Sequence, residues 1–109
     1  MTTWTIHHLD RRAGELYRLR AVRGPIVAEL KCPRRNRNGV EMWHGRIKHK
    51  DRDSIRHRTE SLHEGPGMAL DVLLRRLQHS FERNRAATLA SSIDEAIDAI
   101  WCTDWKGAA

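Results

Sequence analysis

The sequence predicts an α+β fold: an antiparallel sheet of four to five strands, followed by two C-terminal helices packed on one face of the sheet. Two observations support this prediction. Apolar residues recur with a period of two through residues 1–60, as in half-buried strands, and with a period of about 3.6 from residue 68, as in amphipathic helices. All predicted strands precede the helices, which favours α+β over a parallel α/β sheet. The chain of 109 residues suits a single domain, 1–109, with one modest core.

Three strands are expected in the first part of a basic, β-rich region that spans 1–62. Alternating apolar and polar residues predict strands over 4–9 and 26–32. Residues 15–23 alternate as well, with a basic outer side, although their Leu, Arg and Ala content favours a helix as the competing interpretation. The side chains expected to face the core from the second and third strands are Tyr17, Leu19, Ala21, Ile26, Ala28, Leu30 and Cys32. Residues 33–39 then form an arginine-rich loop that ends in an Asn-Gly turn signal.

The segment 40–60 predicts a β-hairpin. In its first strand, Trp43 and Ile47 point toward the core and alternate with charged residues. The short polar side chains of 51–54 hydrogen-bond the local backbone and supply the turn. If the register pairs the two charged sides, five cations share one face of this ribbon: Arg46, Lys48, Lys50, Arg56 and Arg58.

Two helices complete the predicted fold. The first is an amphipathic helix over 68–90, with an apolar stripe formed by Leu70, Leu73, Leu74, Leu77 and Phe81. Ser92 and Glu95 match a capping box, S-x-x-E, which predicts that a capped second helix spans 92–102 and begins at Ser92.

The charge of the chain is concentrated in its first part. The net charge is +6, of which residues 1–60 contribute 15 − 7 = +8 and residues 61–109 contribute 5 − 7 = −2. A one-sided basic excess suggests an anionic partner, either nucleic acid or an acidic protein surface. No apolar run reaches the ~20 residues of a membrane span, and no signal peptide pattern is present, so we expect no membrane partner, a cytoplasmic location and free thiols at Cys32 and Cys102.

The outer face of the predicted sheet is expected to bind nucleic acid, because phosphates need many positive donors along a line. Sheets enter the major groove of DNA and open sheet faces bind RNA, but this face lacks aromatic side chains on which RNA bases stack. The alternative is the solvated face of an ordinary half-buried sheet. The cations expected to contact nucleic acid lie on the strands and in the loop 33–39: Arg18, Arg20, Lys31, Arg34, Arg35, Arg37, Arg46, Lys48, Lys50, Arg56 and Arg58.

The second interpretation is a protein-docking inhibitor or adaptor encoded by a phage or mobile element, for example an anti-CRISPR protein that blocks a host nucleoprotein complex. Its candidate docking residues are Trp43 and Trp105, because large aromatic side chains are frequent interface hot spots. Exposure of both on one apolar patch favours protein docking, whereas their burial favours nucleic-acid binding. In either case we expect a monomer or homodimer.

A remote alternative is a small Mg²⁺-dependent nuclease. Glu29 and Lys31 form an E-x-K pattern on one strand face, with Asp10 upstream. This pattern resembles the acidic-lysine signature of restriction-endonuclease-like nucleases and implies that the carboxylates hold Mg²⁺. The resemblance covers Asp10 and 26–31 only; no helix precedes the first strand, and a basic loop and hairpin follow where that family has a helix.

The sequence predicts no metal site, cofactor or catalytic residue that would make the protein an enzyme. Seven histidines and two cysteines are available, and several of these ligand types gather near the predicted turn at 49–57. None has the C-x-x-C or H-x-x-x-H spacing of a structural zinc site. The sequence therefore predicts a small, non-enzymatic nucleic-acid-binding protein.

Overall fold

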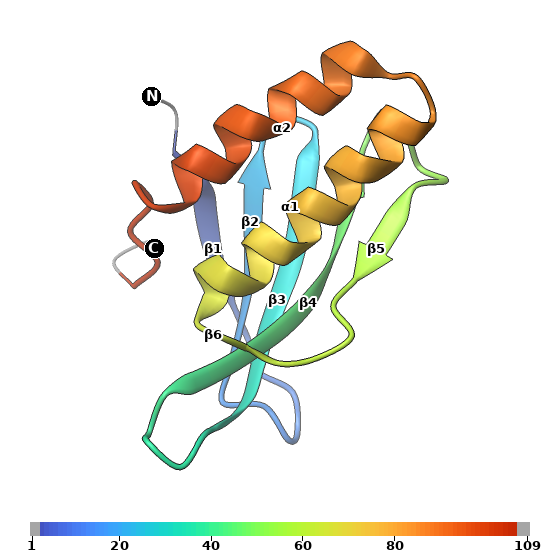
Figure 1. The fold of residues 1–109 in the computed structure, drawn as a ribbon. Helices are drawn as coiled ribbons and strands as arrows, with labels where there is room; N and C mark the ends of the chain where they lie inside the picture. The colour runs from blue at the N-terminus through green and yellow to red at the C-terminus, as the bar shows by residue number, and fades with distance from the viewer. Residues whose placement is uncertain (1–2, 107–109) are drawn as a thin grey trace.

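The sheet follows the chain order as an antiparallel meander, with both helices on one of its faces (Figure 1). The computed structural model describes residues 3–106. The elements are β1 (Thr5–Leu9), β2 (Tyr17–Arg23), β3 (Ile26–Arg35), β4 (Glu41–His49), β5 (Arg56–Arg58), β6 (His63–Glu64), α1 (Pro66–Arg83) and α2 (Ala87–Ile100). The two-residue β6 pairs with the first part of β4. The predicted α+β class is confirmed, with one short strand more than expected.

The core lies between the sheet and the helices. The five predicted inward residues from Leu19 to Leu30, and Cys32 after them, are all buried, and so is the whole predicted stripe of α1. The exception is Tyr17, whose side chain is exposed and whose ring stacks against the Trp43 ring at a centroid distance of 6.2 Å. At this end the strands extend past the helices (Figure 1), so a residue on the inner face is not covered there.

The third strand is longer than predicted, because β3 continues through Pro33 to Arg35. The register between β3 and β4 shifts between Lys31 and Arg34, which indicates a bulge. Proline is tolerated at a bulge because the extra residue is unpaired, so its missing amide proton costs no hydrogen bond between the strands. The expected loop at 33–39 is therefore a tight turn over 36–39 that begins only after Arg35.

The predicted helix boundaries were wrong. The first helix begins at Pro66, a position that tolerates proline because the first-turn amide has no partner, and it ends at Arg83. The amides of Arg85 and Ala86 then bond to the carbonyls of Glu82 and Phe81, and Arg85 has a φ of 58°. This hydrogen-bond pattern is a Schellman motif, which terminates α1 at Arg83.

The capping box does not begin the second helix. The alanine-rich segment from Ala87 favours helix and already belongs to α2. Ser92 lies inside that helix, where its hydroxyl donates to the Leu89 carbonyl at 2.7 Å. Serine hydroxyls in helix interiors often bond back in this way, so the S-x-x-E spacing was coincidental here. Within residues 3–106, no helix has the length and apolar character needed to cross a membrane.

Candidate nucleic-acid interface

The register between β4 and β5 collects the cations on the face of the sheet that the helices leave open. Arg46 lies opposite Arg58, and Lys48 lies opposite Arg56. Because Trp43, Gly45 and Ile47 are buried on the inner face, these charged residues point outward. The predicted pairing of the two charged sides of the ribbon is thus confirmed.

The hairpin turn is built by local hydrogen bonds. The Arg52 amide donates to the His49 carbonyl at 3.0 Å, and the Ile55 amide donates to the Arg52 carbonyl at 2.9 Å. The Arg56 side chain also returns to the turn, where Nε donates to the Asp53 carbonyl at 3.1 Å. These bonds fix the direction in which β5 leaves the turn and thereby the register of the cations.

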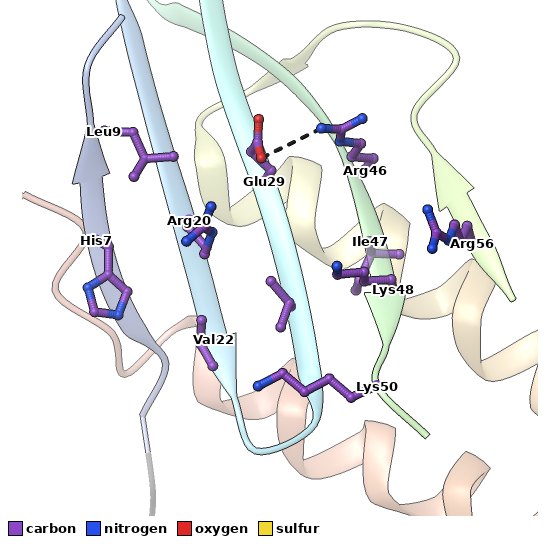
Figure 2. Close-up of a pocket in the computed structure, with 11 residues that line it drawn as sticks. His7, Leu9, Arg20, Val22, Glu29, Arg46, Ile47, Lys48, Lys50 and Arg56 are labelled. Atoms are coloured by element: carbon purple, nitrogen blue, oxygen red, sulfur yellow. Dashed lines mark ion pairs between the residues drawn. The ribbon is translucent and has the colours of Figure 1, made fainter. Parts of the chain in front are cut away.

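A hollow of about 780 Å³ lies on this outer face (Figure 2). Its cationic residues come from three elements and the start of the turn: Arg20, Arg46, Lys48, Lys50 and Arg56. Its apolar residues are Leu9, Val22, Val27 and Ile47. In the part of the chain that the structure describes, Arg20, Lys48, Lys50 and Arg58 form no side-chain ion pair. Their charges are available to a ligand.

In one row across this outer face, the strand pairing separates apolar residues from cations. This row reads Thr5, Val22, Val27, Lys48 and Arg56, from β1 to β5. In this row the apolar residues lie on β2 and β3 and the cations on β4 and β5, whereas Arg20 adds one cation on β2 in the neighbouring row. We had not predicted Val22 and Val27 as site residues, although their alternation with buried neighbours signals that they point outward.

The next row carries the only acidic side chain that lines the hollow among residues 3–106. It reads His7, Arg20, Glu29, Arg46 and Arg58. The Glu29 carboxylate contacts the buried Arg18 guanidinium through one oxygen. Its other oxygen lies 3.7 Å from Arg46 Nη2 (Figure 2).

Arg18 lies on the predicted face but is buried under two carboxylates. Its side chain is 6% exposed and contacts both Glu15 and Glu29. The hydrogen bond from Arg18, together with one from the Arg12 amide, lowers the pKa of Glu15 to about 2, and the bond to Glu15 raises the pKa of Arg18. Because its charge is already neutralised within the protein, the structure does not support Arg18 as a ligand contact.

The remaining predicted cations lie outside the hollow. Arg34, Arg35 and Arg37 belong to the end of β3 and the following turn, at the far end of the β3–β4 hairpin in Figure 1. Arg35 is occupied there, because it donates to the Tyr17 hydroxyl at 2.9 Å and lies 3.8 Å from Glu41. Lys31 pairs across the strand with His44 and is half-buried.

The predicted docking residues do not form an exposed pair. Trp43 is buried, and its indole nitrogen donates to Glu41 at 3.1 Å. Trp105 is half-buried, and its indole nitrogen donates to the Ile100 carbonyl at 3.2 Å. The exposed tryptophan is Trp101, which is 59% exposed. It directly follows α2, which ends at Ile100.

The E-x-K residues lie on one face as expected, but their surroundings are cationic. Arg18 and Arg46 both contact Glu29, and the Arg18 guanidinium lies between Glu29 and the Glu15 carboxylate. Across residues 3–106, no group of three or more His, Cys, Asp and Glu side chains is placed to hold a metal ion.

The two histidines near the hairpin turn, His49 and His57, form hydrogen bonds within the protein. His49 is buried and its Nδ1 accepts from the Asp51 amide at 3.2 Å, while His57 lies 2.6 Å from the Ser80 hydroxyl. Neither ring faces the turn carboxylates as part of a ligand set.

Comparisons with protein-family models, with curated proteins and with solved structures find no match for this chain. The function is therefore inferred from the geometry and charge of the outer sheet face.

Proposed function

We propose that this is a non-enzymatic nucleic-acid-binding protein that uses the outer face of β2 to β5. The observation that carries the proposal is the β4–β5 register, which places Arg46 beside Arg58 and Lys48 beside Arg56. Phosphate groups supply the line of negative charge that such a row of donors fits.

The five ribbon cations that support the proposal are exposed, and among residues 3–106 only Arg46 of these five forms an ion pair. The Arg46 side chain is 74% exposed and its ion pair with Glu29 is long, at 3.7 Å, so a phosphate can compete for it. Lys48 and Arg58 form no ion pair among the described residues. Ordinary surface charges are usually interspersed in sign, whereas this ribbon face carries five cations without an acid between them.

Burial of Trp43 favours nucleic acid over an acidic protein partner. A protein interface normally has an apolar, often aromatic, anchor at its centre. The hollow has no Trp, Tyr or Phe among its lining residues. The proposal includes a cytoplasmic location: Cys32 is buried and Cys102 exposed, with no disulfide between them, which suits a reducing compartment.

The test is a fluorescence anisotropy titration with a labelled DNA duplex, a DNA single strand and an RNA hairpin at several salt concentrations. We expect binding that weakens steeply with salt. The variant Lys48→Gln/Arg58→Gln removes two cations from the ribbon and should reduce the logarithmic salt slope by roughly 1.4 to 1.8, because each phosphate contact contributes about 0.7 to 0.9.

The control is Arg83→Gln/Arg85→Gln, which removes the same charge from exposed positions at the end of α1, within the helix layer. We expect the control to bind nearly as the parent does. Absence of binding at low salt would contradict the proposal, and so would an equal loss in the two variants, which would indicate a non-specific effect of net charge.

A further inference from the structure

We infer that the hollow binds a single-stranded nucleic acid, with its phosphates along β4 and β5 and its bases over Val22 and Val27. This inference rests on the proposed function and specifies the class of nucleic acid. It is carried by the cross-strand row in which an apolar half, Val22 and Val27 on β2 and β3, adjoins a cationic half on β4 and β5.

The cross-strand row fixes this division. Val22 and Val27 face each other on β2 and β3, Val27 faces Lys48, and Lys48 faces Arg56. Neighbouring strands lie about 4.8 Å apart, so about 10 Å separates Val22 from Lys48. That span is comparable with the reach of one nucleotide from its phosphate to the far edge of its base.

The cationic half also has the spacing of a single strand. Arg46 and Lys48 project from alternate residues of β4, about 6.7 Å apart, and Lys50 follows two residues later at the start of the turn. Successive phosphates of an extended single strand have a similar spacing. The segment therefore offers one donor for each phosphate along the strand direction.

A duplex fits this surface less well. Double-stranded DNA has a phosphate backbone on both sides of each groove, and its bases are stacked in the interior. A duplex centred on the hollow places one backbone over Val22 and Val27. These side chains cannot replace the water that the phosphates lose, and burial of a charge without a partner is unfavourable. A single strand instead offers its bases, whose faces bury readily against apolar side chains.

Glu29 strengthens the division. Its carboxylate lies between Arg20 and Arg46 in the central row, is held by Arg18, and lines the hollow. A negative charge at this point repels phosphates from the centre of the face. Phosphates are therefore favoured on the side of β4, β5 and their turn, where four of the five cations that line the hollow lie.

The test compares a mixed-sequence single strand of about 12 nucleotides, as DNA and as RNA, with the blunt duplex of the same sequence. Affinities are measured by anisotropy at one salt concentration. We expect both single strands to bind roughly tenfold more tightly than the duplex. Comparison of the DNA and RNA single strands shows whether the 2′-hydroxyl of the sugar changes the affinity.

The base position is tested with Val22→Thr/Val27→Thr, which keeps the shape and the strand preference of valine. We expect this variant to weaken single-strand binding several-fold and duplex binding by less than about twofold. The control is Val40→Thr, an exposed valine in the turn after β3, outside the hollow. As a readout that needs no variant, the methyl NMR signals of Val22 and Val27 should shift on titration with the single strand.

The outcomes separate the two proposals. Equal affinity for duplex and single strand, or a valine variant that behaves like the Val40→Thr control, would overturn the inference while salt-dependent binding still supported the proposed function. If no probe binds even at low salt, the proposed function itself fails and the inference fails with it.

Discussion

Oε2 of Glu29 lies 3.7 Å from Nη2 of Arg46 on the outer face of the sheet. The carboxylate is 20% exposed, whereas the guanidinium is 74% exposed, so the pair has an inner acidic member and an outer basic member. The Arg18 guanidinium forms a second ion pair with the Glu29 carboxylate. An incoming phosphate therefore competes with Glu29 for Arg46 and is repelled by the same carboxylate.

Replacement of Glu29 by glutamine should raise the affinity for nucleic acid. The variant removes the negative charge but keeps an oxygen that accepts from Arg18. Two unit charges about 4 Å apart in water interact with about 1 kcal/mol, which corresponds to roughly a fivefold change in affinity. The preference for single strand over duplex should also narrow, because phosphates are then tolerated at the centre of the face.

The measurement is the same anisotropy titration, with Glu82→Gln as the control, because Glu82 is exposed on α1 and is not among the residues of the hollow. An unchanged or lower affinity of Glu29→Gln relative to this control would contradict the assignment of Glu29 as a phosphate-repelling group.

Alanine at Gly45 should destabilise the protein. Gly45 lies in the middle of β4 and faces inward, where an added Cβ would be 2.7 Å from Leu30 Cδ2 and would also clash with the backbone of Glu29. A glycine inside a strand often marks such a close approach. We expect the free energy of unfolding to fall by about 1–3 kcal/mol, the usual effect of overpacking.

Urea denaturation measures this change. For comparison, Gly14→Ala introduces a side chain at a φ of 82° into open space, so its effect comes from backbone conformation alone. A Gly45→Ala variant as stable as the parent would show that the strands separate easily at this point, in which case the register of the cationic ribbon is less firmly held than we infer.

The strands and the face of the site were predictable because a period of two specifies which side chains share a face. Burial of Ile26, Ala28 and Leu30 settles the direction of every outward neighbour on that strand. The hairpin turn then fixed the pairing of Lys48 with Arg56. These features depend on local sequence, which the alternation shows directly.

Three features depended on contacts that alternation does not show. Burial of Arg18 requires Glu15 and Glu29 to converge on it from two different segments. The apolar half of the hollow requires Val22 and Val27 to be neighbours across two strands. The start of α2 was missed because S-x-x-E also occurs inside helices, and the real boundary is set by the left-handed conformation of Arg85.

Acidification should destabilise the protein between about pH 7 and pH 5. Burial lowers the pKa of His44, His49 and His57 below the ordinary value of 6.5. Arg76 adds to the effect on the pKa at His57, whereas Asp51 opposes it at His49. As the pH falls through about 6.5, the unfolded chain takes up protons that the folded protein does not. Stability is therefore full above this value and is lost as the pH decreases.

The measurement is the free energy of unfolding as a function of pH. His57→Gln keeps a hydrogen-bond partner for Ser80 and removes one titrating histidine, so it should reduce the loss of stability at low pH. Each histidine contributes at most about 1.4 kcal/mol per pH unit to that loss. His79→Gln, at an exposed position on α1, is the control. Identical pH profiles for the His57→Gln variant and the parent would show that His57 does not contribute.

The two thiols should differ in reactivity. Cys102 is exposed, whereas Cys32 is buried, and burial raises the pKa of the Cys32 thiol. Since the thiolate is the reactive form, a disulfide reagent should modify one thiol of the native protein rapidly and the second only after unfolding. Cys102→Ser should abolish the rapid phase. Rapid modification of both thiols in the native state would contradict the burial of β3.

Glycine at position 85 should stabilise the protein. Arg85 follows the C-cap Asn84 of α1 and adopts a φ of 58°, where a residue with a side chain costs roughly 1–2 kcal/mol. The Schellman bonds from Ala86 to Phe81 and from Arg85 to Glu82 hold it in this conformation, in which glycine is the preferred residue.

Part of this gain is offset by the greater freedom of glycine in the unfolded chain. We therefore expect Arg85→Gly to raise the free energy of unfolding by about 0.5–1 kcal/mol, with an increase of a few degrees in Tm. Arg83→Gly removes the same charge from the last turn of the helix and should instead lower stability by about 1 kcal/mol. Because the two variants differ in backbone conformation and not in charge, effects of the same sign would show that the left-handed residue does not determine where α1 ends.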